Sequence, residues 1–250
     1  KISMNDWVQG YVVGKTQWNE RLFSLNIDAP VASFRAGQFT KVALDLGDER
    51  VGRPYSFVNA PDERPLEIYF NEVPEGPLTP RLSQLEKGDT LWVAEQARGV
   101  FTMEQVPDHR DLWLLATGTG LGVYLSILRT EAPWRRFERI ILVHGVRNAE
   151  ELSYSAVLND LRDRQGSGFQ YTPVLSREQR PHTLHGRIPG LVEQGTLERH
   201  VGTQISPEHS HLMLCGNSGM IKEMRRILDA RGLRRHRRDQ PGHYTTEQYH

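Results

Sequence analysis

Alternating hydrophobic and polar residues organise the first part of the chain. Between Trp7 and about Thr102, short runs in which apolar side chains alternate with polar ones are separated by turn residues. This spacing is typical of antiparallel strands in a small sandwich or barrel. The runs expected to form strands are WVQGYVVGKTQW, RLFSLNI, QFTKVALDL, RPYSFVNA, LEIYFNEV and TLWVAEQ.

The second part of the chain follows a different pattern. After Asp111, apolar runs are each followed by a segment with helical spacing, which indicates a parallel sheet covered on both faces. These runs are LWLLAT, IILVHGV, QYTPVLS and HLMLCG. The clearest helix has one apolar face, formed by Met220, Met224, Ile227 and Leu228. We therefore predict an antiparallel sandwich or barrel over 1–104 and an α/β parallel-sheet domain over 105–250.

Composition narrows the class of protein. The 250 residues include 25% charged and 38% hydrophobic residues, and the formal net charge is zero. A neutral chain offers no global electrostatic reason to bind nucleic acid or a membrane surface. Cys215 is the one cysteine, so the chain has no internal disulfide and no cysteine-ligated iron–sulfur cluster. We expect a cytoplasmic protein without a membrane-spanning segment.

Two glycine turns follow predicted strands. TGTGLG, residues 117–122, lies between the run LWLLA and the segment YLSIL, where glycines let backbone N–H groups approach phosphate oxygens. Close packing of a strand on a helix also requires glycine, so the turn alone leaves both interpretations open. LCGN, residues 214–217, places Cys215 and Asn217 at the same edge of the sheet. A single buried cysteine is more often a small hydrophobic residue than a nucleophile.

Arginines recur after the predicted strands of the second domain. Arg147, Arg177 and Arg187 follow successive strands, and Ser176 adds a hydroxyl beside Arg177. Each arginine alone is more often a solvated surface residue. Together they would meet at one edge of the sheet, where guanidinium groups suit a ligand with a pyrophosphate and a 2′-phosphate.

RPYSFVNAP, TGTGLGVYLSIL, LSRE, HGRIP and LCGNSGM together resemble the bacterial ferredoxin/flavodoxin–NADP reductases, a group within the plant-type ferredoxin–NADP reductase superfamily. The similarity runs from WVQGYV to GHYTTEQYH, and its most specific part is the Arg-x-Tyr-Ser element. It implies an FAD-binding barrel domain and an NADP-binding α/β domain whose C-terminal tail returns to the flavin. The implied activity is hydride transfer between NADPH and FAD, with single electrons passed to or from ferredoxin or flavodoxin.

The resemblance also implies roles for particular residues. Arg53 would pair with the FAD pyrophosphate, Tyr55 would pack on the isoalloxazine ring, and Ser56 would hydrogen-bond near its reactive nitrogen. The implied FAD contacts are Arg53, Pro54, Tyr55, Ser56, Gly76, Leu78, Thr79, Thr119, Tyr249 and His250. The implied NADP contacts are Gly118, Gly120, Arg147, Ser176, Arg177, Arg187, Gly216 and Asn217. The residues expected at the reacting atoms are Ser56, Cys215 and Glu247.

The sequence departs from the family pattern at three positions. Val123 and Ser218 stand where proline is usual, which we expect to change turn stiffness more than chemistry. His250 stands where an aromatic residue commonly packs on the flavin or its adenine. A histidine can stack in the same way, but it titrates near neutral pH.

Residues 225–240, RRILDARGLRRHRRDQ, concentrate arginines in a neutral chain. The run is either a solvated helix face or a docking patch for an acidic ferredoxin or flavodoxin. Two other functions stay open: a reductase component that delivers NADPH electrons to an oxygenase, and a nucleic-acid-binding module that uses this run. No aromatic residues interleave with these arginines, so we expect no nucleic-acid partner. A monomer is the default expectation for the oligomeric state. We also expect no metal site, because His109, His144, His182 and His185 lack metal-ligand spacing.

Overall fold

The computed structural model describes residues 6–249 and divides the chain into two compact units. Unit 1 contains the residues up to 102 together with 122–130. Unit 2 contains 103–121 together with the residues from 131 onward. The chain thus passes between the units after residues 102, 121 and 130, whereas the sequence pattern suggests one boundary after residue 104.

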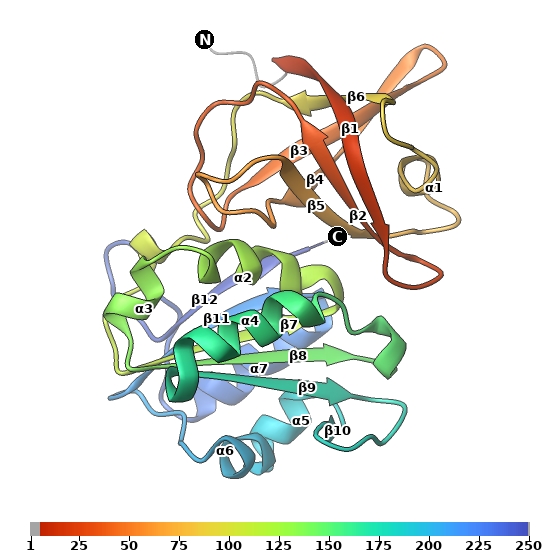
Figure 1. Cartoon of the computed structure of the whole chain (residues 1–250). Coiled ribbons are helices and arrows are strands. Elements are labelled where there is room, and N and C mark those ends of the chain that lie inside the picture. Colours follow the sequence, from red (N-terminus) through yellow and green to blue (C-terminus); the bar gives the residue numbers. More distant parts are fainter. Residues whose placement is uncertain (1–5, 250) are drawn as a thin grey trace. The chain divides into compact units, whose positions relative to one another are not determined.

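Unit 1 is built on a six-stranded antiparallel sheet, drawn from red to yellow in Figure 1. Its strands are β1 (Trp7–Gln17), β2 (Leu22–Asp28), β3 (Phe39–Leu46), β4 (Glu49–Ser56), β5 (Leu66–Asn71) and β6 (Thr90–Ala94). They lie in the order β4-β3-β6-β1-β2-β5, and the edge strands β4 and β5 come into contact. This curled sheet confirms the predicted antiparallel barrel.

The core of unit 1 follows the period of two expected of strands. Phe23, Leu25 and Ile27 point inward from alternate positions of β2, and all three are buried. Phe23 lies directly opposite Phe70 of β5, and the two rings stack with centroids 5.8 Å apart. Cross-strand aromatic pairs of this kind stabilise a sheet and help to fix its register.

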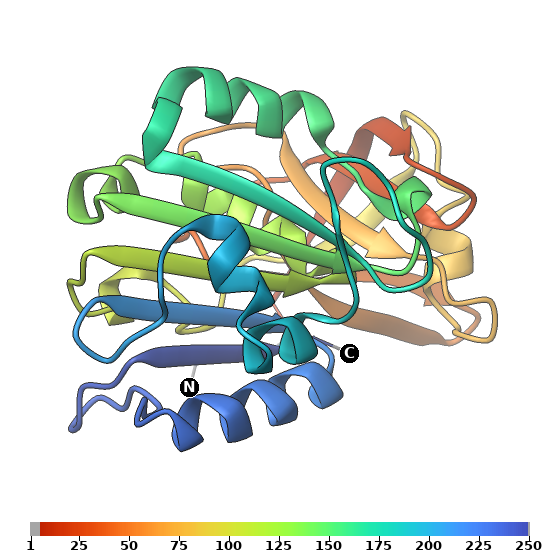
Figure 2. The same cartoon turned by 90° about the horizontal axis from the view of Figure 1, so that it is seen from below.

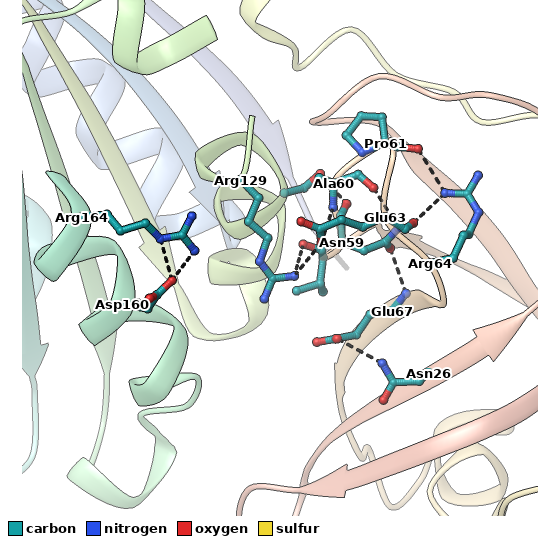
Figure 3. A network of polar contacts seen from close by, with 12 residues as sticks. Asn26, Asn59, Ala60, Pro61, Glu63, Arg64, Glu67, Arg129, Asp160 and Arg164 are labelled. Carbon is teal, nitrogen blue, oxygen red and sulfur yellow. Dashed lines mark hydrogen bonds and ion pairs between the residues drawn. The ribbon is translucent and has the colours of Figure 1, made fainter. Parts of the chain in front are cut away.

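The expected strand over residues 53–60 is wrong in its second half, because β4 ends at Ser56. The side chain of Asn59 holds the following turn instead: its Oδ1 accepts a hydrogen bond from Glu67 N at 2.9 Å. Its Nδ2 donates to Glu63 O at 3.0 Å (Figure 3). A buried asparagine that bonds to nearby backbone groups competes with the ladder of a sheet.

Residues 122–130 return to unit 1 and carry most of helix α2 (Leu121–Leu128). The Ser126 hydroxyl, fully buried, donates to Asn59 O at 2.8 Å. Arg129 donates to Val58 O at 3.3 Å and lies 3.7 Å from a Glu63 carboxylate oxygen (Figure 3). These contacts attach the segment to the turn that follows β4. The short helix α1 (Thr79–Leu82) also belongs to unit 1.

Unit 2 is built on a six-stranded sheet in which every neighbouring pair is parallel. The strands are β7 (Asp111–Thr117), β8 (Arg139–Val146), β9 (Phe169–Leu175), β10 (Leu184–His185), β11 (Ser210–Gly216) and β12 (Tyr244–Gln248). Their order is β10-β9-β8-β7-β11-β12, so β7 lies in the interior of the sheet. This confirms the predicted parallel α/β class, although neither β10 nor β12 was expected as a strand.

Helices cover both faces of this sheet (Figures 1 and 2). One face carries α4 (Ser155–Gln165), and the other carries α5 (Ile188–Glu193), α6 (Thr196–Val201) and α7 (Ser218–Ala230). The shorter elements of the unit are η1 (Met103–Gln105), η2 (Gly118–Gly120), α3 (Ala132–Arg136), η3 (Ala149–Glu151) and η4 (Gly166–Gly168).

Helix α7 confirms the expected amphipathic pattern. Met220, Met224, Ile227 and Leu228 are all buried and belong to one core with the central strands. The helix begins after Asn217, whose side-chain oxygen accepts a hydrogen bond from Met220 N at 2.9 Å. Asparagine is a favoured residue at this capping position, so the end of LCGN also starts the helix.

Candidate functional site

The functional side chains lie in two sets, one in each unit. In unit 1, Arg53, Pro54, Tyr55 and Ser56 form the last half of β4. Because β4 is an edge strand of its sheet, the missing N–H of Pro54 costs no ladder hydrogen bond to a second neighbour. The RPYS element is therefore presented on a strand edge that is free to meet a ligand.

Arg53 and Tyr55 are suited to different ligand groups. The Arg53 side chain is exposed and donates to Gly52 O at 2.8 Å, which leaves further guanidinium N–H groups for an anion. Tyr55 is half-buried and packs edge-on against Phe70 with ring centroids 6.1 Å apart. Burial raises the pKa of Tyr55 to about 12, so its phenol stays neutral at physiological pH. Ser56, the last residue of β4, is half-buried beside it.

The GPLTP loop closes on itself. The Thr79 hydroxyl accepts a hydrogen bond from Val73 N at 2.8 Å, and Gly76 N donates to Val73 O at 2.9 Å. Leu78 is fully buried in the core of unit 1. The Thr79 hydroxyl, expected as a phosphate contact, is thus already engaged in holding the loop, and backbone N–H groups are the better candidates for that contact.

In unit 2, every expected residue that the structure describes lies at the carboxyl ends of the parallel strands. Thr117 ends β7 and Gly216 ends β11, and these two strands are neighbours. The same edge carries Gly118, Thr119, Gly120, Arg147, Ser176, Arg177, Arg187, Cys215, Asn217, Glu247 and Tyr249. In open parallel sheets this edge is where ligands bind.

The glycines of this edge allow two turns to pack backbone against backbone. A Cβ at position 120 would lie 2.6 Å from Cys215 O, and a Cβ at position 216 would lie 2.2 Å from the Thr117 hydroxyl oxygen. Gly118 adopts a φ of +54°, a backbone conformation that residues other than glycine rarely take. The glycines thus serve close packing, as the structural interpretation of the motif requires.

The three expected arginines follow three neighbouring strands. Arg147 comes directly after β8, Arg177 lies two residues after β9, and Arg187 lies two residues after β10. All three side chains are exposed. The backbones of the first two loops are joined, because Arg177 N donates to Arg147 O at 3.0 Å. The sheet order therefore gathers these cations along one part of the carboxyl edge.

Cys215 and Glu247 lie side by side in the register of β11 and β12. The Cys215 thiol is buried, and burial, with a smaller contribution from Glu247, raises its pKa well above the ordinary value. A thiol that resists ionisation is a poor nucleophile, so Cys215 is better suited to packing than to covalent chemistry. Burial also raises the pKa of Glu247 to about 7, so this carboxyl group can hold or release a proton near neutral pH.

Tyr249 extends β12 at the same edge. Its N–H donates to Gly216 O at 3.1 Å, and its phenol hydrogen-bonds with Thr117 and Asn217. A Cβ at position 118 would lie 2.9 Å from the Tyr249 hydroxyl, so the tyrosine covers the TGTG turn. His250, expected to contact the flavin, lies outside the described residues.

Two residues near the site were missed by the sequence analysis. His144, fully buried in β8, donates its Nε2–H to Gly118 O at 2.8 Å, and burial lowers its pKa to about 4. A histidine within the apolar run LVHGV is the only sequence signal of this role. Glu178, next to Arg177, accepts a hydrogen bond from Ala149 N. No sequence pattern marks this contact.

A cluster of histidines lies at the opposite, amino edge of the sheet. The ring centroid of His211 lies 6.1 Å from that of His109 and 6.3 Å from that of His236. The ring centroids of His109 and His243 are 6.1 Å apart. Among residues 6–249, no group of three or more His, Cys, Asp or Glu residues is arranged to hold a metal ion. Within that range, too, no helix is both long and apolar enough to cross a membrane.

Comparisons with known proteins agree with this arrangement. Residues 114–226 match the family model of the oxidoreductase NAD-binding domain. The chain is 45% identical over 247 residues to a flavodoxin/ferredoxin–NADP reductase of Shigella flexneri, covering 98% of this chain and 100% of that protein. It is 33% identical to a ferredoxin–NADP reductase of Pseudomonas aeruginosa, covering 94% of this chain and 95% of that protein.

A solved structure is similar over the whole length. It is a ferredoxin NADP⁺ reductase from Neisseria gonorrhoeae with bound FAD and NADP, and it superimposes with a TM-score of 0.93 at 30% sequence identity. The superposition covers 98% of this chain and 99% of that chain. Both units of the present fold therefore have counterparts in one protein.

Proposed function

Because the chain belongs to the family of flavodoxin/ferredoxin–NADP reductases, we propose that it transfers hydride between NADPH and FAD and passes single electrons to or from ferredoxin or flavodoxin. The observation that carries this proposal is the end-to-end similarity, which spans both the RPYS strand of unit 1 and the glycine turns of unit 2. A match to the NAD-binding domain alone, residues 114–226, would not have supported the proposal that unit 1 binds FAD.

The residues of unit 1 fit FAD. Arg53 offers an exposed guanidinium for the pyrophosphate, and Tyr55 offers the face of a neutral, half-buried ring for the isoalloxazine. Leu78 and Thr79 would contribute backbone N–H groups in the loop that begins at Gly76, and Pro54 would shape the strand edge. The resemblance to the family also implies Thr119, Tyr249 and His250 as FAD contacts. When bound, FAD supplies the chemistry, since it takes up one hydride, which carries two electrons, and releases the electrons one at a time.

The residues of unit 2 fit NADP. Three exposed arginines after neighbouring strands match a ligand with several phosphate groups, and Ser176 adds a hydroxyl donor. Gly118, Gly120, Gly216 and Asn217 belong to the two turns that would contact the nicotinamide ribose and the pyrophosphate. The 2′-phosphate that distinguishes NADPH from NADH would be held by the arginines, so NADPH is the expected donor.

The residues proposed at the reacting atoms hold and position rather than react covalently. Ser56 would donate a hydrogen bond to the ring system near the site of hydride transfer. Cys215, kept as a neutral thiol, would pack against the nicotinamide. Glu247, whose pKa of about 7 lets it exist in both forms, would hold or release the proton that accompanies electron transfer.

The arginine run, residues 225–240, does not lie at the carboxyl edge of the sheet of unit 2. Arg226 and Arg231 are engaged with Glu193 and Glu198, at 3.3 and 2.7 Å. The exposed arginines beyond α7 lie in the loop that leads back to the start of β12, at the amino edge of the sheet. With 13 residues in α7, that loop is about 20 Å along the helix from the carboxyl edge. The proposed role of the run is a docking patch that an acidic ferredoxin or flavodoxin contacts directly, because exposed charges separated by more than a Debye length are largely screened.

Docking makes a salt-dependent prediction. The Debye length at physiological ionic strength is about 8 Å, so the rate of encounter with an acidic carrier should fall as salt rises. Electron transfer to ferredoxin that is equally fast at low and high ionic strength would exclude this role.

We further propose that the protein acts as a monomer in the cytoplasm and binds no nucleic acid.

The test of the proposed function is the visible absorption spectrum of the purified protein, followed anaerobically as NADPH or NADH is added. A yellow protein bleached much faster by NADPH supports flavin, donor and arginine assignments together. A colourless protein that FAD cannot reconstitute would overturn the proposal. Reduction followed by transfer to an oxygenase, but not to ferredoxin or flavodoxin, would favour the oxygenase reductase instead.

A further inference from the structure

We propose that the carboxylate of Glu178 is a positioning group that holds the Arg147 and Arg177 loops of unit 2 in the arrangement that distinguishes NADPH from NADH. The inference rests on the proposed function, because it concerns the 2′-phosphate of that donor. Glu178 follows Arg177 in the sequence, within a region expected to bind a polyanion. A negative charge at this place would oppose phosphate binding unless it has another task.

The contacts of Glu178 show what that task is. One carboxylate oxygen accepts a hydrogen bond from Ala149 N in η3, two residues beyond Arg147. The backbone carbonyl of Glu178 accepts a hydrogen bond from His185 Nδ1 at 2.9 Å, and His185 lies two residues before Arg187. The Glu178 side chain thus connects the segments that follow β8 and β9, whereas the bond to His185, the last residue of β10, uses a backbone carbonyl that any residue would supply.

Its charge is already balanced within the loop. The second carboxylate oxygen accepts a hydrogen bond from Arg180 Nε at 2.9 Å, an ion pair in which the Glu178 side chain is 25% exposed. The hydrogen bond from Ala149, followed by that from Arg180, holds the pKa of Glu178 below its ordinary value, so the carboxylate is ionised at neutral pH. Hydrogen bonds to an ionised acceptor are the stronger kind.

Neighbouring residues reinforce the same connection. Ser176 N donates to Val146 O, and Arg177 N donates to Arg147 O, both at 3.0 Å. These backbone bonds set the first two loops side by side but do not involve the third. The Arg187 segment is held by the pairing of β10 with β9, by the bond of Gly186 N to Leu175 O at 2.9 Å, and by the contact between His185 and Glu178.

Two opposite outcomes follow from positioning and from simple charge repulsion. If Glu178 only repels phosphate, its removal should tighten NADPH binding. If it positions the arginines, its removal should weaken NADPH binding and leave NADH, which lacks the 2′-phosphate, nearly unchanged. Loss of a charge-assisted hydrogen bond of this kind corresponds to about a tenfold change in affinity.

The experiment compares Glu178→Ala with the wild-type holoenzyme in steady-state kinetics with NADPH and with NADH, and in equilibrium binding of NADP⁺ and NAD⁺. We expect the KM for NADPH and the Kd of NADP⁺ to rise about tenfold, with kcat unchanged and the NADH values within about twofold. Glu178→Gln keeps an oxygen that can accept from Ala149 N, so it should restore most of the affinity. Gln179→Ala, at the exposed neighbouring position, is the matched control and should behave as wild type.

Several results would overturn the inference. Tighter NADP⁺ binding by Glu178→Ala would mean that repulsion dominates. Equal losses for NADPH and NADH, or a Glu178→Gln variant as impaired as Glu178→Ala, would mean that the residue lacks this specific role. Failure of the proposed function would be recognised separately, since the wild-type protein itself would then show no NADPH-dependent flavin reduction.

Discussion

Replacing His211 with leucine is expected to remove much of the loss of stability that the protein suffers in acid. His211 is buried at the start of β11, its Nε2 lies 3.4 Å from the Thr245 hydroxyl, and a hydrogen bond with the Gly242 backbone partly opposes the lowering of its pKa. Burial, and then the charges of neighbouring histidines, lower its pKa from 6.5 to about 3. The neighbours that face it are His109, His236 and His243.

The sign and size of the effect follow from linkage. Above pH 6.5 His211 is neutral in both the folded and the unfolded chain, so its titration costs no stability. As the pH falls below 6.5 the unfolded chain takes up the proton first, and the free energy of unfolding decreases by about 1.4 kcal/mol per pH unit until the folded pKa is reached. Between pH 6.5 and pH 4 this one residue should therefore remove about 3 kcal/mol of stability, a large part of a typical total.

The assay is urea unfolding of the holoenzyme, followed by circular dichroism at several pH values between 7.5 and 4 at constant ionic strength. At pH 7.5 we expect His211→Leu to be less stable than wild type by about 1–2 kcal/mol, because the contacts to Thr245 and to the Gly242 backbone are lost while the leucine fills a similar volume. His211→Asn, which also does not titrate, serves if the leucine variant fails to fold. His200→Asn, at an exposed position of α6, should keep the wild-type pH profile.

The reasoning is refuted if the wild-type and His211→Leu proteins lose the same stability between pH 7.5 and pH 4. The other three histidines titrate in both proteins, and burial lowers the pKa of each of them. The difference between the two pH profiles, rather than either profile alone, therefore reports on His211.

Three further predictions concern the two sites. Gly120→Ala should destabilise the protein by about 2 kcal/mol or more in thermal unfolding, because its Cβ would lie 2.6 Å from a backbone oxygen, whereas Gly190→Ala, with nothing within 4 Å, should not destabilise it. Arg177→Ala should raise the KM for NADPH about tenfold, with NADH as the internal control; an equal change for both donors would argue against a 2′-phosphate contact. Ser56→Ala and Cys215→Ala should each slow flavin reduction in stopped-flow experiments while FAD stays bound, and unchanged rates in both variants would remove these residues from the reacting centre.

The architecture was predictable wherever periodicity is strong. The alternating runs of the first part became antiparallel strands, and the apolar face of α7 is buried as expected. Strands β10 and β12 were not predicted, because the first has only two residues and the second, YTTEQ, lies at a sheet edge and needs no continuous apolar run. Every residue of α2 is buried, so no polar face in its sequence reveals that residues 122–130 pack with unit 1.

The site was predictable where a residue's function follows from its type and its place after a strand. Arg147, Arg177 and Arg187 could be assigned to one edge because the order of parallel strands is constrained. The contacts of Glu178 and His144 could not be predicted, since they depend on hydrogen bonds to backbone atoms 29 and 26 positions away in the sequence. Their backbone partners can be any residue, so no amino-acid pattern marks them.

The repeated passage of the chain between the units affects how such a protein can be divided or recombined. A gene fragment that stops after residue 102 would encode every strand of unit 1 but not residues 122–130. The carbonyl of Asn59 would then lose its buried hydrogen bond from Ser126. Val58 and Tyr69 would lose their packing against the segment at Gly122. A chimera joined at one point would inherit the same defect. An exchange of unit 1 between relatives should therefore carry the 122–130 segment of the same parent, as a separate insert within the second half of the gene.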